Sequence, residues 1–284
     1  MPRHPPKPSK PTSRSSRPGQ APVGRPARDQ RQAKAGPGDA GPRHGVARVL
    51  SKAGVCSRTE AARWVQAGRV SVDGRKVLDP EFPVRSGHSK VRVDGQLLGQ
   101  REHLYLMLNK PRGLVTTTAD ERGRDTVYRC FEAAQLPWLA PVGRLDKASE
   151  GLLLFSSDPE WAALITSHVG GIRKTYHVQV DAVLSDDQVA AIAAGAEHEG
   201  QWLSALSVRL LRQGQRSSWL EVVLEEGRNR HIRRLMQVHG LEVQRLLRTA
   251  IGEVSLGELP KGQWRLLTAQ EINALRSPCQ LTIA

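Results

Sequence analysis

The sequence predicts an α+β protein in which a basic tail precedes a small α+β module and a larger mixed-sheet domain. Residues 1–44 hold ten of the 18 prolines and no Leu, Ile, Phe, Trp or Tyr, too little apolar surface to offset the entropy of ordering. Residues 45–98 contain two helical patterns followed by paired strand patterns. Residues 103–284 mix strand and helix patterns without strict βαβ alternation, which favours an α+β domain over a doubly wound one.

The charge of the chain indicates a polyanionic partner. The formal net charge is +14 and the pI is about 10.4. Residues 1–44 carry ten basic and two acidic side chains, so the tail accounts for +8 and the remaining chain for +6. Because the predicted domains are basic in their own right, nucleic acid is the expected partner, and the tail is expected to raise non-specific affinity for it.

The cysteines and the hydropathy of the chain indicate in which cellular compartment the protein is expected. Cys56, Cys130 and Cys279 are far apart and lack metal-site spacing, which is typical of reduced thiols in an intracellular protein. No apolar run approaches the roughly 18 residues of a membrane helix, and the N-terminus has no signal-peptide hydrophobic region. We therefore expect a soluble, cytoplasmic protein.

The small module is predicted to contain two helices and two hairpins. The first helix ends at Gly54, and the second opens with Ser57 and Glu60 in capping-box spacing. Asp-Gly pairs at 73–74 and 94–95 interrupt alternating strands and predict hairpin turns. The helical part carries five cations that could form either a solvated face or an RNA contact: Arg48, Lys52, Arg58, Arg63 and Arg69.

The cations by themselves favour a solvated helix face, and the order of the elements around them adds a second observation. The stretch RVLSKAGVCSRTEAARWVQAGRVSVDGRKV follows a helix–SR–helix–G.V.V.G pattern. It resembles the αL-type RNA-binding domain first named in a small-subunit ribosomal protein. That resemblance implies that the five cations contact RNA.

The larger domain begins with an apolar strand at 104–108 that Asn109-Lys110-Pro111 is expected to stop. Asp158 and Pro159 predict a helix start, and KTYHVQV at 174–180 alternates as a strand. Further patterns predict a helix opened by Ser185, a strand in SWLEVVLEEG, a helix in RNRHIRRLMQVHG, and closing strands in VQRLLRTAIGEVSL and GQWRLLT.

One carboxylate in this domain has an unusual setting. In GRLDKASEGLLLF, Asp146 lies between Arg144 and Lys147, directly before an apolar run. Nearby cations favour an ionised carboxylate, which suits a nucleophile. An isolated Asp in a turn is more often structural, so this stretch alone does not assign catalysis.

Two further segments bear on the chemistry. Tyr176 lies in the strand beside Lys174, where a tyrosine is usually a packing residue. Four arginines are expected at the start of a helix, where cations oppose the helix dipole unless they meet phosphate or a carboxylate: Arg228, Arg230, Arg233 and Arg234. A solvated basic face remains an alternative for Arg228 and Arg234.

Together the segments GRLDKASEGLLLFSSD, KTYHVQV and EGRNRHIRRL resemble the bacterial ribosomal-RNA pseudouridine synthases of the RsuA/RluB type. LNKPRGLVTT before them and LLRTAIGEVSLGELPKGQWR after them extend the likeness over residues 104–268. An αL-type domain in front of the catalytic domain is the usual layout of these enzymes. The resemblance implies a mixed-sheet catalytic domain that isomerises uridine to pseudouridine in ribosomal RNA.

The resemblance also implies the roles of individual residues. Asp146 would be the nucleophile, attacking ribose C1′ or uracil C6, Tyr176 would pack on the uracil and remove the C5 proton, and Arg233 would pair with the aspartate. Arg144 would hold the base out of its stack, because the reactive atoms are inaccessible inside a duplex. Further RNA contacts are expected from Lys110, Arg228, Arg230 and Arg234. His231 departs from the family, whose members often carry Gln or Glu there.

No cofactor or metal is expected, because the reaction is an isomerisation and the nine histidines lack zincin spacing. The partner is expected to be ribosomal RNA or a ribosomal assembly intermediate, and the chain a monomer. The compact interval from GGIRKTYHVQV to EEGRNR and the ending IGEVSLGELPKGQWR resemble the large-subunit (23S) type, with a small-subunit (16S) enzyme as the alternative. A non-catalytic RNA-binding assembly factor remains a second alternative, but it would need no combination of Asp146, Tyr176 and Arg233. A DNA-binding protein has less support, since no helix-turn-helix or zinc signature is present.

Overall fold

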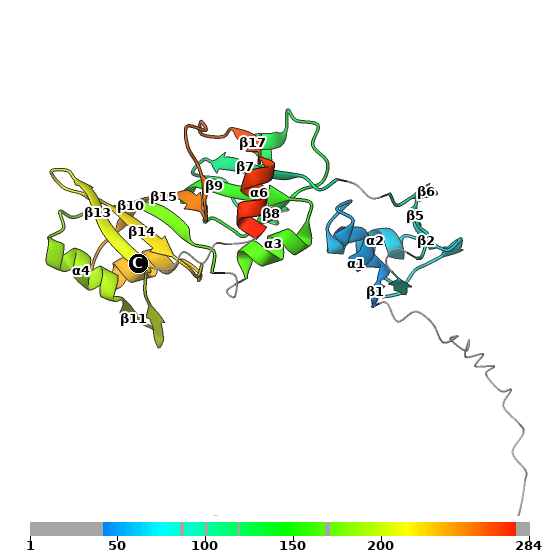
Figure 1. Cartoon of the computed structure of the whole chain (residues 1–284), viewed down its shortest axis with the longest axis horizontal. Coiled ribbons are helices and arrows are strands. Elements are labelled where there is room, and N and C mark those ends of the chain that lie inside the picture. Colours follow the sequence, from blue (N-terminus) through cyan, green and yellow to red (C-terminus); the bar gives the residue numbers. More distant parts are fainter. Residues whose placement is uncertain (1–41, 86–87, 100–101, 119, 168–170, 277–284) are drawn as a thin grey trace, which may run out of the picture. The chain divides into compact units, whose positions relative to one another are not determined.

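The computed structural model describes residues 42–85, 88–99, 102–118, 120–167 and 171–276 (Figure 1). Most of the predicted tail and Cys279 lie outside these residues. Arg43 and His44, which the sequence assigned to the tail, form strand β1 (Arg43–Gly45) with β4 (Pro83–Arg85). The ordered module thus begins earlier than predicted, because two backbone segments pair where side-chain hydrophobicity gives no signal.

The N-terminal module, Arg43–Leu97, has the predicted helices and hairpins. Helices α1 (Val46–Lys52) and α2 (Arg58–Gln66) precede a four-stranded antiparallel sheet in the order β3-β2-β5-β6. Its strands are β2 (Val70–Val72), β3 (Arg75–Lys76), β5 (Val91–Val93) and β6 (Gln96–Leu97). Ser57 caps α2 by accepting from the Glu60 amide, but the Glu60 carboxylate accepts from Trp64 Nε1 instead of completing the capping box.

The larger domain is built on a nine-stranded mixed sheet, counted over the described residues. The strands run in the order β13-β14-β10-β15-β9-β7-β17, with β16 beside β15 and β8 beside β9. Their bounds are β7 (Tyr105–Lys110), β8 (Ala140–Val142), β9 (Glu150–Ser156), β10 (Lys174–Val180), β13 (Ser207–Gln213), β14 (Ser218–Leu224), β15 (Val243–Ile251), β16 (Val254–Ser255) and β17 (Trp264–Leu266). A separate ribbon pairs β11 (Ala196–His198) with β12 (Gln201–Leu203).

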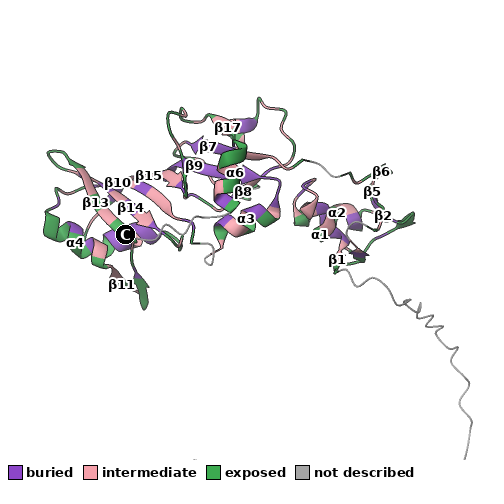
Figure 2. Ribbon diagram, viewed as in Figure 1, coloured by how far each residue is buried: buried purple, intermediate pink, exposed green. Residues whose placement is uncertain are grey.

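The sheet has two ends, one formed by β13, β14, β10 and β15 and the other by β9, β7 and β17, and different helices cover them. One face packs against α4 (Asp186–Ala194), α5 (His231–Val238) and a 3₁₀ helix at Val127–Phe131. The other face of β7 and β9 packs against α3 (Pro159–Thr166) and α6 (Ala269–Arg276). Strand β9 is therefore buried along its whole length, whereas β10 and β14 alternate between buried and partly exposed residues (Figure 2).

A short parallel seam joins the two ends. β9 and β15 are the one parallel pair in the described sheet, and only Leu247–Glu150 and Arg248–Gly151 are in register. Gly151 has φ +100°, and a Cβ there would lie 2.3 Å from the Arg248 carbonyl oxygen. Glycine is thus required for the strands to approach this closely.

Two predicted boundaries are wrong. β7 continues through Asn109 and ends at Lys110, directly before Pro111, because both polar side chains find buried partners. Asn109 Nδ2 donates to the Leu259 carbonyl, and Lys110 donates to the carbonyls described below. The helix expected over the RNR segment begins at His231, since Arg230 adopts a left-handed conformation with φ 50° and ψ 30°.

Candidate active site

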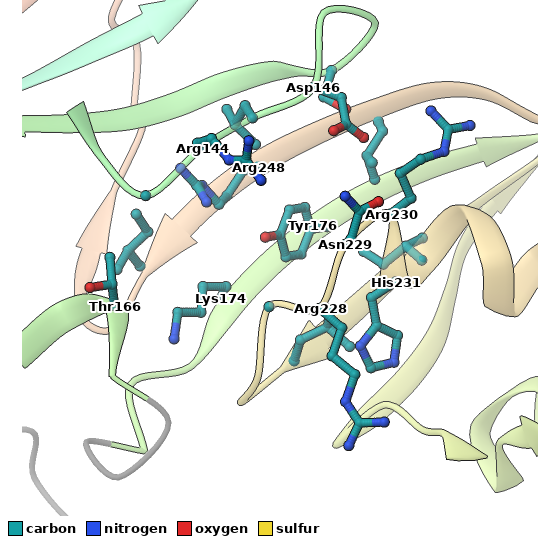
Figure 3. A pocket seen from close by; sticks show the side chains of 18 of the residues that line it. Arg144, Asp146, Thr166, Lys174, Tyr176, Arg228, Asn229, Arg230, His231 and Arg248 are labelled. Carbon is teal, nitrogen blue, oxygen red and sulfur yellow. The ribbon is translucent and has the colours of Figure 1, made fainter. Parts of the chain in front are cut away.

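A cleft of about 330 Å³ opens where the two ends of the sheet meet (Figure 3). Four segments line it: the loop before β9, strand β10, the loop that leads into α5, and strand β15. The side chains at its wall include Arg144, Asp146, Lys174, Tyr176, Arg228, Asn229, Arg230, His231 and Arg248. The sequence motifs, up to 100 residues apart in the chain, therefore converge on one cavity.

Asp146 is the one carboxylate among the residues that line this cleft. The preceding residue, Leu145, is buried, and its backbone makes two hydrogen bonds with Thr116 Oγ1, one from the hydroxyl (2.8 Å) and one to it (3.4 Å). Ser149 N donates to the Asp146 carbonyl at 3.0 Å. The backbone is thus fixed on both sides of Asp146, while its side chain remains partly exposed.

The side chain of Lys110 binds the same loop through its carbonyls. The prediction that Lys110 contacts RNA is therefore wrong. The Lys110 side chain is fully buried, and Nζ donates to the carbonyls of Pro111 (3.1 Å), Asp146 (3.3 Å) and Ser149 (2.8 Å). Burial lowers the pKa of this amine to about 8, against the opposing charge of Asp146. Because no atom of Lys110 reaches solvent, its role is to position the Asp146 loop.

Tyr176 and Arg248 form the floor of the cleft (Figure 3). They are opposite each other in the antiparallel pair of β10 and β15, and both are buried. Arg248 Nε donates to the Leu152 carbonyl of β9 at 2.7 Å, so this side chain bridges the seam. Its Nη2 is buried with no partner among the described residues, which leaves a donor available at the cleft wall.

Five cations surround the single carboxylate: Arg144, Lys174, Arg228, Arg230 and Arg248. Of these, only Arg228 forms an ion pair with a described residue, Glu226 at 2.9 Å. Lys174 Nζ donates to the Glu225 carbonyl, and burial together with the charge of Arg248 lowers its pKa. The cleft therefore presents several uncompensated positive charges, as a site for a polyanion requires.

Arg233 does not form the expected ion pair with Asp146 in this structure. Its Nη1 donates to the Val243 carbonyl at 3.0 Å, while Nε and Nη2 are buried without a partner among the described residues. Burial and the charge of Arg230 lower the pKa of its guanidinium, and Asp146 acts in the opposite direction. Arg233 thus lies within the field of Asp146, beside a shallow cavity that Arg230 and Val243 also line.

The remaining arginines of the motif separate into two kinds. Arg230 is exposed and lines the cleft, and its role as an RNA contact stays a prediction. Arg234 instead donates to His198 Nδ1 (3.4 Å) and Gln201 Oε1 (3.1 Å), which fastens the β11–β12 ribbon to α5. Arg228 combines both positions, since it lines the cleft and donates to the Trp202 carbonyl of the ribbon at 3.0 Å.

His231, the departure from the family pattern, is buried at the first position of α5 and lines the cleft. Burial is the main cause that lowers the pKa of its imidazole, and the charge of Glu226 acts in the opposite direction. The structure thus places the ring of His231 at the cleft, at the position where relatives often carry Gln or Glu.

In the N-terminal module, three of the five predicted RNA-binding cations are paired with acids of the same module. Arg58 pairs with Glu81, Arg63 with Glu60, and Arg69 with Asp94. Lys52 is partly buried, whereas Arg48 is exposed and forms no ion pair with a described residue.

Sequence reasoning missed Arg248, Lys174 and Asn229 as cleft residues. For Arg248 a signal was present, because the two-residue periodicity of VQRLLRTAI places this arginine on the same inward face as Leu246. An inward-facing arginine in a strand is unusual and marks a bound carbonyl or ligand.

The described residues contain no helix that is long and apolar enough to cross a membrane. Nor do they contain a group of three His, Cys, Asp or Glu side chains arranged for a metal ion.

Comparison with known proteins places both domains. Residues 104–238 match the RNA pseudouridylate synthase family, and residues 46–89 match the S4 domain. An uncharacterized RNA pseudouridine synthase of Rickettsia conorii is 34% identical over 224 residues, which cover 78% of this chain and 95% of that protein. The chain belongs to the RsuA/RluB family of RNA pseudouridine synthases.

Other relatives in the family carry more specific names. Ribosomal large subunit pseudouridine synthase B of Haemophilus influenzae is 36% identical, covering 81% of this chain and 66% of that protein. The Shigella flexneri protein of the same name is 35% identical, covering 82% of this chain and 83% of its own length. A crystal structure of a pseudouridylate synthase superposes with a TM-score of 0.58 at 28% identity, covering 82% of this chain and 99% of the other.

Family membership settles the broad predictions. The chain is an RNA-modifying isomerase with an S4 domain followed by a mixed-sheet catalytic domain, as the sequence predicted.

Proposed function

We propose that this enzyme isomerises a uridine of large-subunit ribosomal RNA, acting as a cytoplasmic monomer with Asp146 as its nucleophile. The observation that carries the proposal is the position of Asp146 as the one carboxylate in a cleft that five cations and a buried tyrosine line. The names of the Haemophilus and Shigella relatives support the large-subunit target.

The chemistry needs one nucleophile and one base. The Asp146 carboxylate adds either to ribose C1′, which breaks the bond from C1′ to uracil N1, or to uracil C6 before that bond breaks. In both routes a bond from C5 to C1′ replaces the bond from N1, C5 loses its proton, N1 gains one, and the aspartate carboxylate is released. Atoms are conserved throughout, so the reaction needs no co-reactant.

The neighbouring side chains fit the remaining tasks. Tyr176 is fixed on β10 at the floor of the cleft, where it can pack on a flipped uracil and take the C5 proton. Arg144 is exposed at the rim and suits the space that the flipped nucleotide leaves in its stack. Arg233 acts on the aspartate through its charge, and binding of RNA is the event expected to bring the two groups into direct contact.

The direct test incubates the purified chain with unmodified 23S and 16S rRNA and maps pseudouridine in each. One new pseudouridine in 23S rRNA is expected, and Asp146→Asn should form none while it binds RNA within a few-fold of wild type. Asp187→Asn, an exposed carboxylate in the first turn of α4, is the matched control and should convert like wild type.

Two results would overturn parts of the proposal. Conversion of 16S rRNA alone would replace the substrate by the small-subunit RNA. Conversion by Asp146→Asn at the wild-type rate would remove Asp146 from its role.

A further inference from the structure

Trp202 is more exposed to solvent than the other tryptophans of the chain. Its side chain is 58% exposed, whereas the other five tryptophans are buried or partly buried. Large aromatic surface is costly to leave in water, and an exposed tryptophan is a frequent contact for partners. Trp202 lies on the β11–β12 ribbon, which extends away from the nine-stranded sheet (Figure 1).

The ribbon is short but rigid. Its two-residue turn, Glu199-Gly200, has positive φ at both positions, as the tight hairpin turns of twisted strands require. One face of the ribbon packs on α5, where Leu203 is fully buried and Arg234 donates to His198 and Gln201. The ribbon is therefore fixed to the same helix whose first residues line the catalytic cleft.

The opposite face of the ribbon displays the indole. Gly195, with φ +84°, precedes the ribbon, and a Cβ at this position would lie 3.1 Å from Trp202 Nε1. One edge of the indole thus rests on backbone that has no side chain, which leaves the exposed ring area for a partner. Arg228 ties this position to the cleft, because it lines the cleft and donates to the Trp202 carbonyl.

The charges around the indole indicate a base rather than a phosphate as its partner. Glu197 lies directly opposite Trp202 in the ribbon, and both Glu197 and Glu199 are exposed, so the tip repels phosphate. Bases, in contrast, stack on aromatic rings and offer amino groups that a carboxylate accepts. The cations that attract the RNA backbone lie at the root of the ribbon and in the cleft.

We propose that Trp202 is a stacking platform for an unpaired base of the RNA substrate outside the catalytic cleft. The ribbon would hold this base beside the nucleotide that enters the cleft, so that it contributes to the choice of uridine. This inference rests on the proposed function, since it takes the RNA around the target uridine as the partner.

The test measures binding of a protein-free RNA stem-loop that carries the uridine converted by the wild-type chain. Trp202→Ala should bind it between about 5-fold and 150-fold more weakly, since stacking of one base on an aromatic ring contributes roughly 1–3 kcal/mol. Trp202→Phe should recover most of the affinity, because a ring remains. Leu266→Ala, which removes a side chain 52% exposed on β17, is the matched control and should bind like wild type.

Two controls separate the possible partners. On a fully paired RNA duplex, Trp202→Ala and wild type should bind equally, because no base face is free. Equal binding of the stem-loop by wild type and Trp202→Ala would overturn the inference. So would a defect seen only on ribosomal particles, since it would identify a protein as the occupant.

Failure of the proposed function is distinguishable from failure of this inference. If wild type converts no uridine in either rRNA, binding to unmodified 23S rRNA is compared instead. Weaker binding by Trp202→Ala would then support the stacking role without the catalytic one, and equal binding would overturn it.

Discussion

The S4 domain and the catalytic cleft both carry five predicted or observed cations, but the two sets differ in how they are compensated. In the S4 domain, Arg58, Arg63 and Arg69 each pair with a carboxylate of the same domain. In the cleft, four of the five cations form no ion pair with a described residue.

This difference shows that a count of basic residues does not locate an RNA site. An arginine whose charge is offset by a carboxylate adds less to the local positive potential than an unpaired arginine does. Free cations around one acid, by contrast, attract the backbone of RNA and leave that acid available for chemistry. Among these ten cations, those without an ion pair to a described residue are four in the cleft and Arg48 in the S4 domain.

Lys110 belongs to neither set, because it donates to three backbone carbonyls and not to a ligand. Its substitution should have the largest effect of those predicted here, a loss of stability. Lys110→Met should lower the free energy of unfolding by about 1–3 kcal/mol for each buried carbonyl left without a donor. Urea denaturation measures this loss, and the rate of conversion should fall with it because the Asp146 loop loosens.

The difference in free energy of unfolding between wild type and Lys110→Met should depend on pH, and the lowered pKa of Lys110 fixes the direction of the change. The folded state has a Lys110 pKa of about 8 against an ordinary value of 10.5, so between these pH values the unfolded chain binds more protons. Stability contributed by Lys110 therefore rises with pH in this window and is constant below pH 8. The free energy of unfolding of wild type, relative to Lys110→Met, should increase from pH 8 to pH 10. A decrease would contradict the effect of burial on this amine.

Arg144→Ala should have the next largest effect, a loss of RNA affinity, since Arg144 is exposed at the cleft without an ion pair to a described residue. A plot of log binding constant against log salt should become shallower by roughly 0.7–0.9, the value for one phosphate contact. An unchanged slope would show that Arg144 acts on the base alone.

The smallest effects should come from the S4 domain and should distinguish Arg48 from Arg69. Arg69 donates three hydrogen bonds to Asp94 and stacks on Trp64 at 4.9 Å, so Arg69→Ala should change RNA affinity by about twofold or less. Arg48→Ala should reduce the salt dependence of binding, which filter binding over a salt series measures. If Arg69→Ala weakens binding more than Arg48→Ala does, its ion pair opens on RNA.

The sequence predicted those elements whose signals are local. The caps at Ser57, Asp158 and Ser185 and the alternation of KTYHVQV depend on neighbours within a few residues, and the structure confirms each. The end of β7 was predicted wrongly, because Asn109 and Lys110 are stabilised by carbonyls distant in the sequence. Hydropathy alone treats such residues as strand breakers.

The same limit applies to the site. Asp146 and Tyr176 were found because the motif spacing carries them, and the structure brings both to one cleft. The roles of Lys110 and Arg234 could not be predicted, since the difference between a phosphate contact and a structural donor depends on which acceptor the fold places nearby. The catalytic roles of Asp146 and Tyr176 stay predictions.

The short parallel pairing of β9 and β15 fixes how Asp146 and Tyr176 lie relative to each other. The acid belongs to a loop of one end of the sheet and the tyrosine to a strand of the other, and two residue pairs align the ends. Any side chain larger than hydrogen at position 151 would push the ends apart at the Arg248 carbonyl. The relative position of Asp146 and Tyr176 thus depends on the absence of a single methyl group at a buried residue.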